Sequence, residues 1–111
     1  AWQWVDAEAL GSNAALLAVT AAVELARRDL DAGDPDGALW ATQQGLVALP
    51  GHEELVALRL QAHAARRDLA GLRGEWEQYE RVLEADPWMA AEPSDTLLSL
   101  RAELVNRLRS R

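Results

Sequence analysis

The sequence predicts an all-α fold in which about five helices stack as antiparallel pairs. Apolar residues recur at helical spacing along most of the chain, and glycine and proline stand at the boundaries between these segments. No stretch alternates between apolar and polar residues for long enough to form a strand. Half of the residues are apolar, and many are alanine, which favours helices and adds little core volume. We therefore expect helices that pack closely through small side chains.

The first long helix is expected from Ser12 to about Ala32. Residues Trp2 to Leu10 form a shorter helical candidate before it, and Gly11-Ser12-Asn13 is expected to separate the two. Gly33 follows the long helix at the position where a left-handed residue commonly ends one. The apolar stripe of the long helix is Leu16, Val19, Val23, Ala26 and Leu30, at spacings of 3, 4, 3 and 4.

The second helix begins after Asp34, which is expected to cap it, with Pro35 in its first turn. It ends at Pro50-Gly51, and its apolar residues are Ala38, Leu39, Leu46 and Leu49. The third helix begins with Glu53 and Glu54, whose charges complement the positive end of the helix dipole. Its apolar residues are Leu55, Val56, Leu58, Leu60, Ala62 and Ala65.

Asp68 is expected to cap the fourth helix, which ends at Asp86-Pro87. Its apolar and aromatic residues are Leu72, Trp76, Tyr79, Val82 and Leu83. A loop from Pro87 to Pro93 follows, and Ser94 caps the last helix. The stripe of that helix is Leu97, Leu100, Leu104 and Leu108, and it is expected to close the open end of the stack.

An internal repeat relates the second and fourth helices at an offset of 34 residues. The paired positions are Asp34 and Asp68, Gly37 and Gly71, Gln44 and Gln78, and Leu49 and Leu83. Thirty-four residues is the tetratricopeptide period, and the spacing of twelve positions between Ala38 and Pro50 also fits that repeat. Ala26, Ala38 and Gly45 are expected where helices cross closely, whereas Arg67 replaces Gly33 and Tyr79 replaces Gly45 in the second copy. The predicted fold is a tetratricopeptide-like right-handed stack of antiparallel helix pairs.

Three segments resemble the bacterial transcriptional activator domain, a tetratricopeptide-like module of antibiotic regulatory proteins. They are the opening Trp4-Val5-Asp6-Ala7-Glu8, the turn and helix start Ala32-Gly33-Asp34-Pro35-Asp36-Gly37-Ala38-Leu39, and Glu92-Pro93-Ser94-Asp95-Thr96 before the last helix. In that family the domain follows a winged-helix DNA-binding domain, which these 111 residues do not contain. Some relatives instead end large multidomain proteins with envelope-binding modules.

The resemblance implies a non-catalytic regulatory domain that binds proteins. Its partner would be its own DNA-binding domain, a second copy of itself as a homodimer, or another protein. The alternative is a stand-alone or envelope-associated helical-repeat scaffold unrelated to transcription. We expect residues 1–111 to form a single domain excised from a larger protein, since the chain begins at Ala1 without methionine. The lack of cysteine fits a cytoplasmic location.

The expected binding surface is the concave face of the stack, which the first helix of each pair lines. The groove-facing positions are Thr20, Val23, Arg27, Leu30 and Asp31 in one helix and Glu54, Ala57, Gln61, Ala64 and Ala65 in the next. The partner-binding candidates among them are Thr20, Arg27, Asp31, Glu54 and Gln61. Such a surface suits an extended peptide or a partner's helix. Alternatively, the chain's own N-terminal segment or last helix fills the groove, which would place Trp2 or Trp4 there.

Other function classes find no support in the sequence. His52 and His63 are eleven residues apart, too far along one helix to share a metal, and no cysteine is present. No serine has a histidine and acid companion, and Gly71-Leu72-Arg73-Gly74 lacks the ending of a phosphate-binding loop. We expect no enzyme activity, no cofactor and no metal. The net charge of −7 argues against direct nucleic-acid binding, and no apolar run is long enough to span a membrane.

The tryptophans Trp40 and Trp76 are expected to pack in the core or cover the ends of the stack. Trp2, Trp4 or Trp88 would mark a contact surface if it were exposed, because aromatic side chains anchor interfaces. His52 is interpreted as a turn residue and His63 as a partly buried or surface imidazole.

Overall fold

The computed structural model describes the backbone of residues 2–85 and 92–110, and the side chains of residues 13–85 and 92–110. Five helices make up this part of the chain, and it contains no strand, so the predicted all-α class is confirmed. The loop predicted from Pro87 to Pro93 and the helix end predicted at Asp86-Pro87 lie largely outside the described residues.

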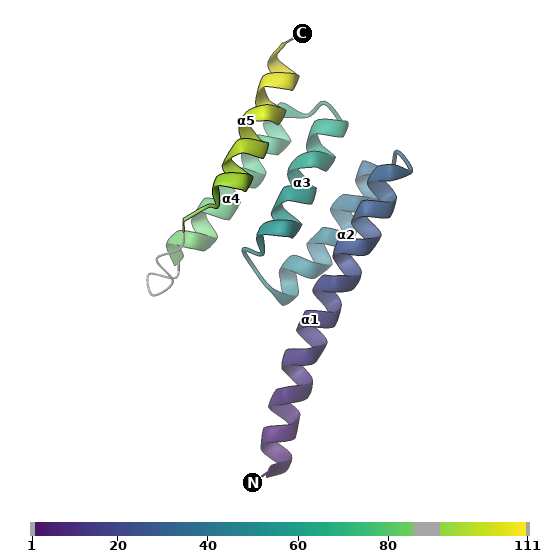
Figure 1. Cartoon of the computed structure of the whole chain (residues 1–111), viewed down its shortest axis with the longest axis vertical. Coiled ribbons are helices and arrows are strands. Elements are labelled where there is room, and N and C mark those ends of the chain that lie inside the picture. Colours follow the sequence, from purple (N-terminus) through teal and green to yellow (C-terminus); the bar gives the residue numbers. More distant parts are fainter. Residues whose placement is uncertain (1, 86–91, 111) are drawn as a thin grey trace.

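Helix α1 spans Trp2–Asp31 without interruption, so the break expected at Gly11-Ser12-Asn13 is wrong. A single glycine costs a helix only about 1 kcal/mol relative to alanine, whereas a break would leave the backbone groups of two helix ends without partners. The stripe residues Val19, Val23 and Ala26 are buried, and Leu30 packs against them. Leu16 is exposed. The N-terminal part of α1 extends beyond the other helices (Figure 1).

Helix α2 spans Pro35–Ala48 and begins as predicted. Gly33 has a φ of 78°, in the left-handed region, and the Asp34 carboxylate accepts a hydrogen bond from the Gly37 amide at 3.0 Å. Proline occupies the first turn, where its lack of an N–H group removes no helical hydrogen bond. The residues between the two helices therefore reverse the chain tightly and set α2 antiparallel to α1.

Helices α3 and α4 span Glu53–Ala65 and Leu69–Ala85. The turn between them repeats the first turn at the 34-residue offset. The amide of Asp34 donates to the Asp29 carbonyl at 2.7 Å, and the amide of Asp68 donates to the His63 carbonyl at 2.9 Å. The Asp68 carboxylate caps α4 through the Gly71 amide at 2.9 Å, as predicted.

Helix α5 spans Asp95–Arg109, and Ser94 caps it by accepting a hydrogen bond from the Leu97 amide at 3.2 Å. Leu97 and Leu104 are buried against α3 and α4. The guanidinium of Arg101 lies 4.4 Å from the ring centre of Trp76, an attractive cation–π geometry. Trp76 is therefore a core residue as expected, whereas Trp40 is 65% exposed and is not part of the core.

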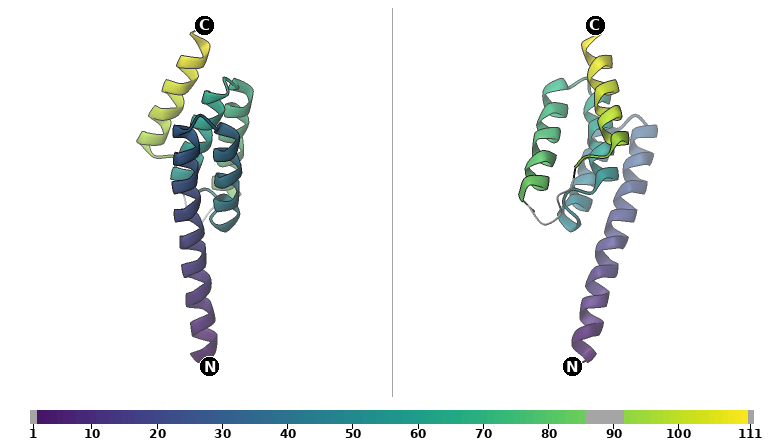
Figure 2. Two further views of the ribbon diagram at one scale, coloured as in Figure 1. Left: turned by 90° about the vertical axis from the view of Figure 1, so that its right-hand side faces the viewer. Right: turned by 60° about the vertical axis from the view of Figure 1, so that its left-hand side comes forward.

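The helices lie in two layers. Helices α1, α3 and α5 form one layer and α2 and α4 the other, as two views of the ribbon show (Figures 1 and 2). One buried cluster joins α1, α2 and α3, and a second joins α3, α4 and α5. Helix α3 belongs to both clusters, so it is the central element of the described structure.

Small residues allow the close crossing in the first cluster. Ala26 and Ala38 have no exposed surface, and a methyl group placed on Gly45 would lie 2.7 Å from Leu55 Cδ1 and 2.9 Å from Ala22 Cβ. The expectation that Ala26, Ala38 and Gly45 permit close approach is confirmed. At the position equivalent to Gly45, Tyr79 instead fills the second cluster with its ring.

Candidate interaction groove

A groove runs between α1 and α3 on the outer face of the α1–α3–α5 layer. It consists of two adjoining hollows of about 490 and 260 Å³. We call this surface the α1–α3 groove. Its lining residues are Leu16, Val19, Thr20, Val23, Glu24, Arg27, Leu30 and Asp31 from α1, and His52, Glu54, Ala57, Leu58 and Gln61 from the α3 side.

All five predicted partner-binding residues line this groove. Thr20, Arg27 and Glu54 line the larger hollow, and Arg27, Asp31, Glu54 and Gln61 line the smaller one. The predicted positions Val23, Leu30 and Ala57 also lie in the lining.

Two predicted positions fall outside the groove. Ala64 packs against the α3–α4–α5 cluster, and Ala65 is exposed at the end of α3. The 34-residue offset therefore predicts most of the groove-facing positions of α3. Because α3 lies between α1 and α5, part of the face that was predicted to line the groove is turned toward α5 instead.

An ion pair between Arg27 and Glu54 crosses the groove from α1 to α3. The two side chains are 62% and 45% exposed, so the pair contributes only about 0–1 kcal/mol to stability. Both charges therefore remain available to a partner at little cost to the fold. The hydroxyl of Thr20 donates to the Leu16 carbonyl at 2.9 Å within α1, and the side chain is exposed.

The chain's own elements do not fill the α1–α3 groove in the described part of the structure. Helix α5 lies beside α3, on the side away from α1 (Figure 1). The N-terminal half of α1 continues straight away from the bundle, so the helix carries Trp2 and Trp4 away from the groove. Their side chains lie outside those described, as does Trp88.

Glu53 fixes α5 at the edge of this layer, a role that the sequence did not reveal. The Ser94 hydroxyl and amide both donate to its carboxylate, the amide at 3.0 Å, and the Tyr79 hydroxyl donates at 3.2 Å. The Ser94 hydroxyl bond is the main reason that the pKa of Glu53 is lowered. From the position of Glu53 at a helix start, the sequence predicted only an interaction with the helix dipole. Its contacts with Tyr79 and Ser94, 26 and 41 positions away, cannot be inferred from neighbouring residues in the sequence.

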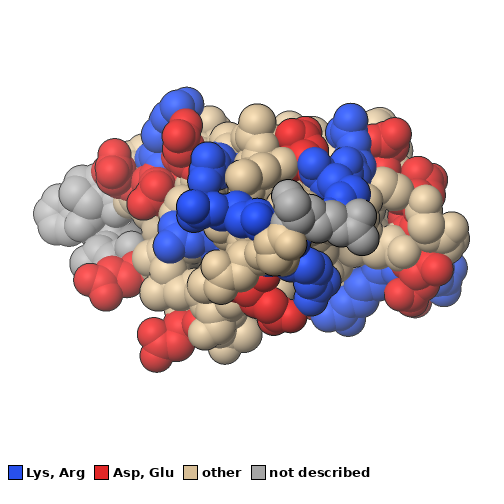
Figure 3. All heavy atoms as spheres, turned by 90° about the horizontal axis from the view of Figure 1, so that it is seen from above, with Lys and Arg blue, Asp and Glu red and all other residues tan. Residues whose placement is uncertain are grey.

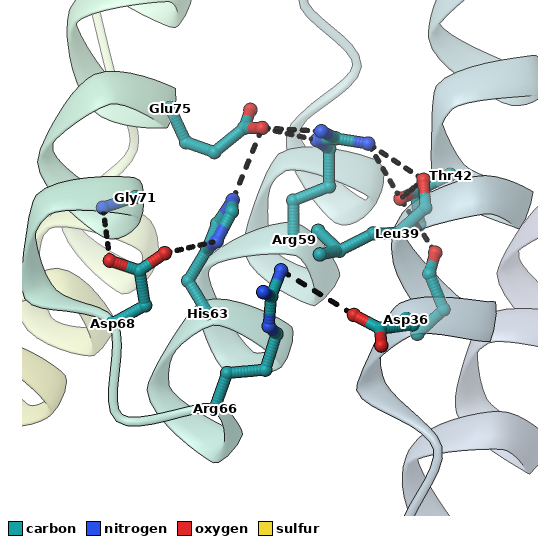
Figure 4. A network of polar contacts seen from close by, with 10 residues as sticks. Asp36, Leu39, Thr42, Arg59, His63, Arg66, Asp68, Gly71 and Glu75 are labelled. Carbon is teal, nitrogen blue, oxygen red and sulfur yellow. Dashed lines mark hydrogen bonds and ion pairs between the residues drawn. The ribbon is translucent and has the colours of Figure 1, made fainter.

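A second polar cluster joins α2, α3 and α4 (Figure 4). Arg59 donates to the Glu75 carboxylate through Nε at 2.7 Å and to the Leu39 carbonyl at 2.8 Å. His63 Nε2 lies 3.3 Å from the same carboxylate oxygen, and a carboxylate only accepts, so Nε2 carries the proton. We name Arg59, His63 and Glu75 the α3–α4 polar cluster.

Burial and polar contacts oppose each other at Glu75. Burial by itself raises the pKa of a carboxyl group, but the hydrogen bonds from His63 and Arg59 and their charge outweigh it and lower the pKa of Glu75 to about 2. At Tyr79, burial and the charge of Glu53 both act against ionisation and raise the pKa to about 12. His63 is 8% exposed, so it is buried more fully than the partly buried or surface imidazole that was expected.

The described residues contain no group of three or more potential ligands that could hold a metal ion. His52 precedes α3 as a turn residue, as interpreted, and its side chain makes no capping hydrogen bond. Arginines and acids lie side by side at the end of the molecule seen from above, where no large patch of one sign is apparent (Figure 3).

Comparisons with known proteins found no matching family model, no matching curated protein and no matching solved structure. Among the described helices, none is both long enough and apolar enough to cross a membrane.

Proposed function

We propose that this chain is a tetratricopeptide-like domain that binds a protein partner in the α1–α3 groove, as the regulatory domain of a bacterial transcriptional regulator. The observation that carries the proposal is the groove itself, which the five residues expected for partner binding line. The two-layer arrangement and the equivalent turns support a right-handed stack of helix pairs. The regulator role rests on the three segments that resemble the bacterial transcriptional activator domain.

The groove suits an extended peptide or a helix better than a small molecule. Its two hollows adjoin along α1 and α3, and apolar residues such as Val23, Leu30 and Ala57 alternate with charged and amide side chains. Apolar contacts supply affinity in such a complex, and polar contacts set its register. A partner carboxylate would bind Arg27, and a partner N–H group would bind Glu54 or Gln61. These contacts would replace the exposed ion pair between Arg27 and Glu54.

The test compares a single charge reversal at Arg27 with a double reversal that keeps opposite charges at positions 27 and 54. Partners captured from the source bacterium are identified, purified and titrated against the wild-type chain, Arg27→Glu, and the double variant Arg27→Glu/Glu54→Arg. We expect the single variant to weaken binding at least tenfold and the double variant to remain weak while melting like the wild type. Recovery of binding in the double variant would show that the pair acts only within the domain.

Two controls make the result specific to the groove and to transcription. Arg81→Glu makes the same charge change on α4, and neither Arg81 nor its ion-pair partner Glu77 lines the groove, so binding should be unchanged. Gln61→Ala should weaken binding without loss of stability, because Gln61 is exposed. A captured DNA-binding protein or domain supports the regulator role, and envelope proteins alone would favour the scaffold alternative.

A further inference from the structure

A hollow of about 360 Å³ lies on the opposite layer from the groove, between α2 and α4. We call it the α2–α4 hollow. Leu46, Val56 and Val82 contribute apolar wall, and the amides of Gln43 and Gln78 come from the two flanking helices. Its volume falls within the range of about 300–1,000 Å³ that is usual for small-molecule sites.

One oxygen of the Glu75 carboxylate has no hydrogen-bond partner among the described residues. Arg59 Nε and Nη2 and His63 Nε2 all approach Oε1, at 2.7, 2.5 and 3.3 Å. Among the described residues none donates to Oε2, and Figure 4 shows the dashed lines meeting at a single oxygen. Glu75 lines the hollow, and its side chain is 15% exposed, so Oε2 keeps an accepting lone pair that a bound molecule can use.

The chemistry of the hollow favours a ligand that donates N–H groups, because the free carboxylate oxygen only accepts hydrogen bonds. Glu75 is the sole acidic residue in the described lining, and Arg59, which lies outside the lining, pairs with its other oxygen, Oε1. The carboxylate is ionised at neutral pH, since its pKa is lowered to about 2. A chain with a net charge of −7 also raises the local concentration of cations.

We propose that the α2–α4 hollow binds a small amphiphile that carries an ammonium or amidinium group on an apolar body. The cationic N–H group donates to Glu75 Oε2, and the apolar body packs against Leu46, Val56 and Val82. The hollow shares no lining residue with the α1–α3 groove, so this proposal does not depend on the proposed function.

The experiment titrates the chain with benzamidine and follows backbone amide signals by NMR. We expect saturable shifts at Gly71 and Gly74, which line the hollow, with a Kd of about 1 mM, as is usual for a ligand of this size. Benzyl alcohol, which has the same ring without the charge, should bind at least tenfold more weakly, and benzoate should not bind. Benzoate binding as tightly as benzamidine would overturn the proposal.

Two pairs of variants locate the site. Gly74 lines the hollow, and a methyl group placed on it meets no atom within 4 Å, so Gly74→Leu should narrow the hollow and abolish binding. Ala70→Leu adds the same side chain at an exposed position of α4 outside the lining and should leave the Kd unchanged.

The second pair tests the carboxylate. Glu75→Gln should weaken benzamidine binding at least fivefold, whereas Glu77→Gln, an equal charge change at an exposed residue outside the lining, should change it less than twofold. An unchanged Kd in Gly74→Leu, or equal losses in the two glutamine variants, would overturn the proposal. If Glu75→Gln does not fold, Gly74→Leu and the benzoate titration decide it.

Discussion

Gly33 and Arg67 occupy equivalent places in two turns 34 residues apart, and both have a positive φ, 78° and 57°. Their amides donate to the carbonyls of Leu30 and Ala64, at 3.1 and 2.9 Å. The same chain reversal is therefore built once with glycine, which adopts this conformation without a steric penalty, and once with arginine, which adopts it at a cost of about 1 kcal/mol.

Substitutions at these two positions should act in opposite directions. Gly33→Val should lower the free energy of unfolding by about 1 kcal/mol or more through backbone strain, since a methyl group there would touch no atom within 4 Å. Arg67→Gly should raise it by roughly 0.5 kcal/mol, because relief of strain exceeds the added freedom of the unfolded chain. Urea denaturation measures both, and a Gly33→Val protein as stable as the wild type would contradict the prediction.

The crossing at Gly45 gives a second prediction. Gly45→Ala should destabilise the fold by about 1–3 kcal/mol, because the new methyl group would lie 2.7 Å from Leu55 Cδ1 and 2.9 Å from Ala22 Cβ. The matched control is Gly74→Ala in α4, where space is open and alanine should stabilise the helix by about 0.5–1 kcal/mol. Equal effects of the two changes on the melting temperature would show that the crossing is looser than described.

Local signals predicted most of the fold. Helix starts at Asp34, Asp68 and Ser94 could be identified because a capping side chain bonds an amide three residues away. The continuous path of α1 through Gly11 could not, because one glycine shifts the balance by only about 1 kcal/mol. The local sequence was ambiguous there.

The candidate groove was predicted through the repeat register, and the other polar sites were not. The 34-residue offset relates Thr20 to Glu54 and Arg27 to Gln61, so it predicted that these residues of α1 and α3 line the same groove. Glu75 and Arg59 are 16 residues apart on different helices, and each by itself is an ordinary charged residue of a helix. Such pairs become apparent only when the packing of α3 against α4 is known.

A third prediction concerns nucleic acid. We expect no binding of this fragment to duplex DNA tighter than about 10⁻⁶ M at physiological salt, because phosphate contacts require clustered positive charge and the net charge is −7. Figure 3 shows arginines mixed with acids at one end of the molecule, which weakens the local field further. A gel-shift titration measures this, and a tighter constant that falls with added salt would overturn it.

The last prediction follows from the lowered pKa of Glu75. The folded-state pKa is about 2 and the ordinary value is 4.5, so the charged carboxylate stabilises the folded state above pH 4.5, and this contribution is lost as the pH falls from 4.5 toward 2. Glu75→Gln should therefore destabilise the protein at pH 7 by about 1–3 kcal/mol, because Arg59 and His63 lose their charged acceptor. The difference from the wild type should be constant above about pH 6 and should shrink below pH 4.5. Urea denaturation at pH 7, 5, 4 and 3 measures it, with Glu77→Gln as the control at an exposed glutamate on the same helix. A difference for Glu75→Gln that stays the same down to pH 3 would mean that the side chain stabilises α3 against α4 by packing and not by its charge.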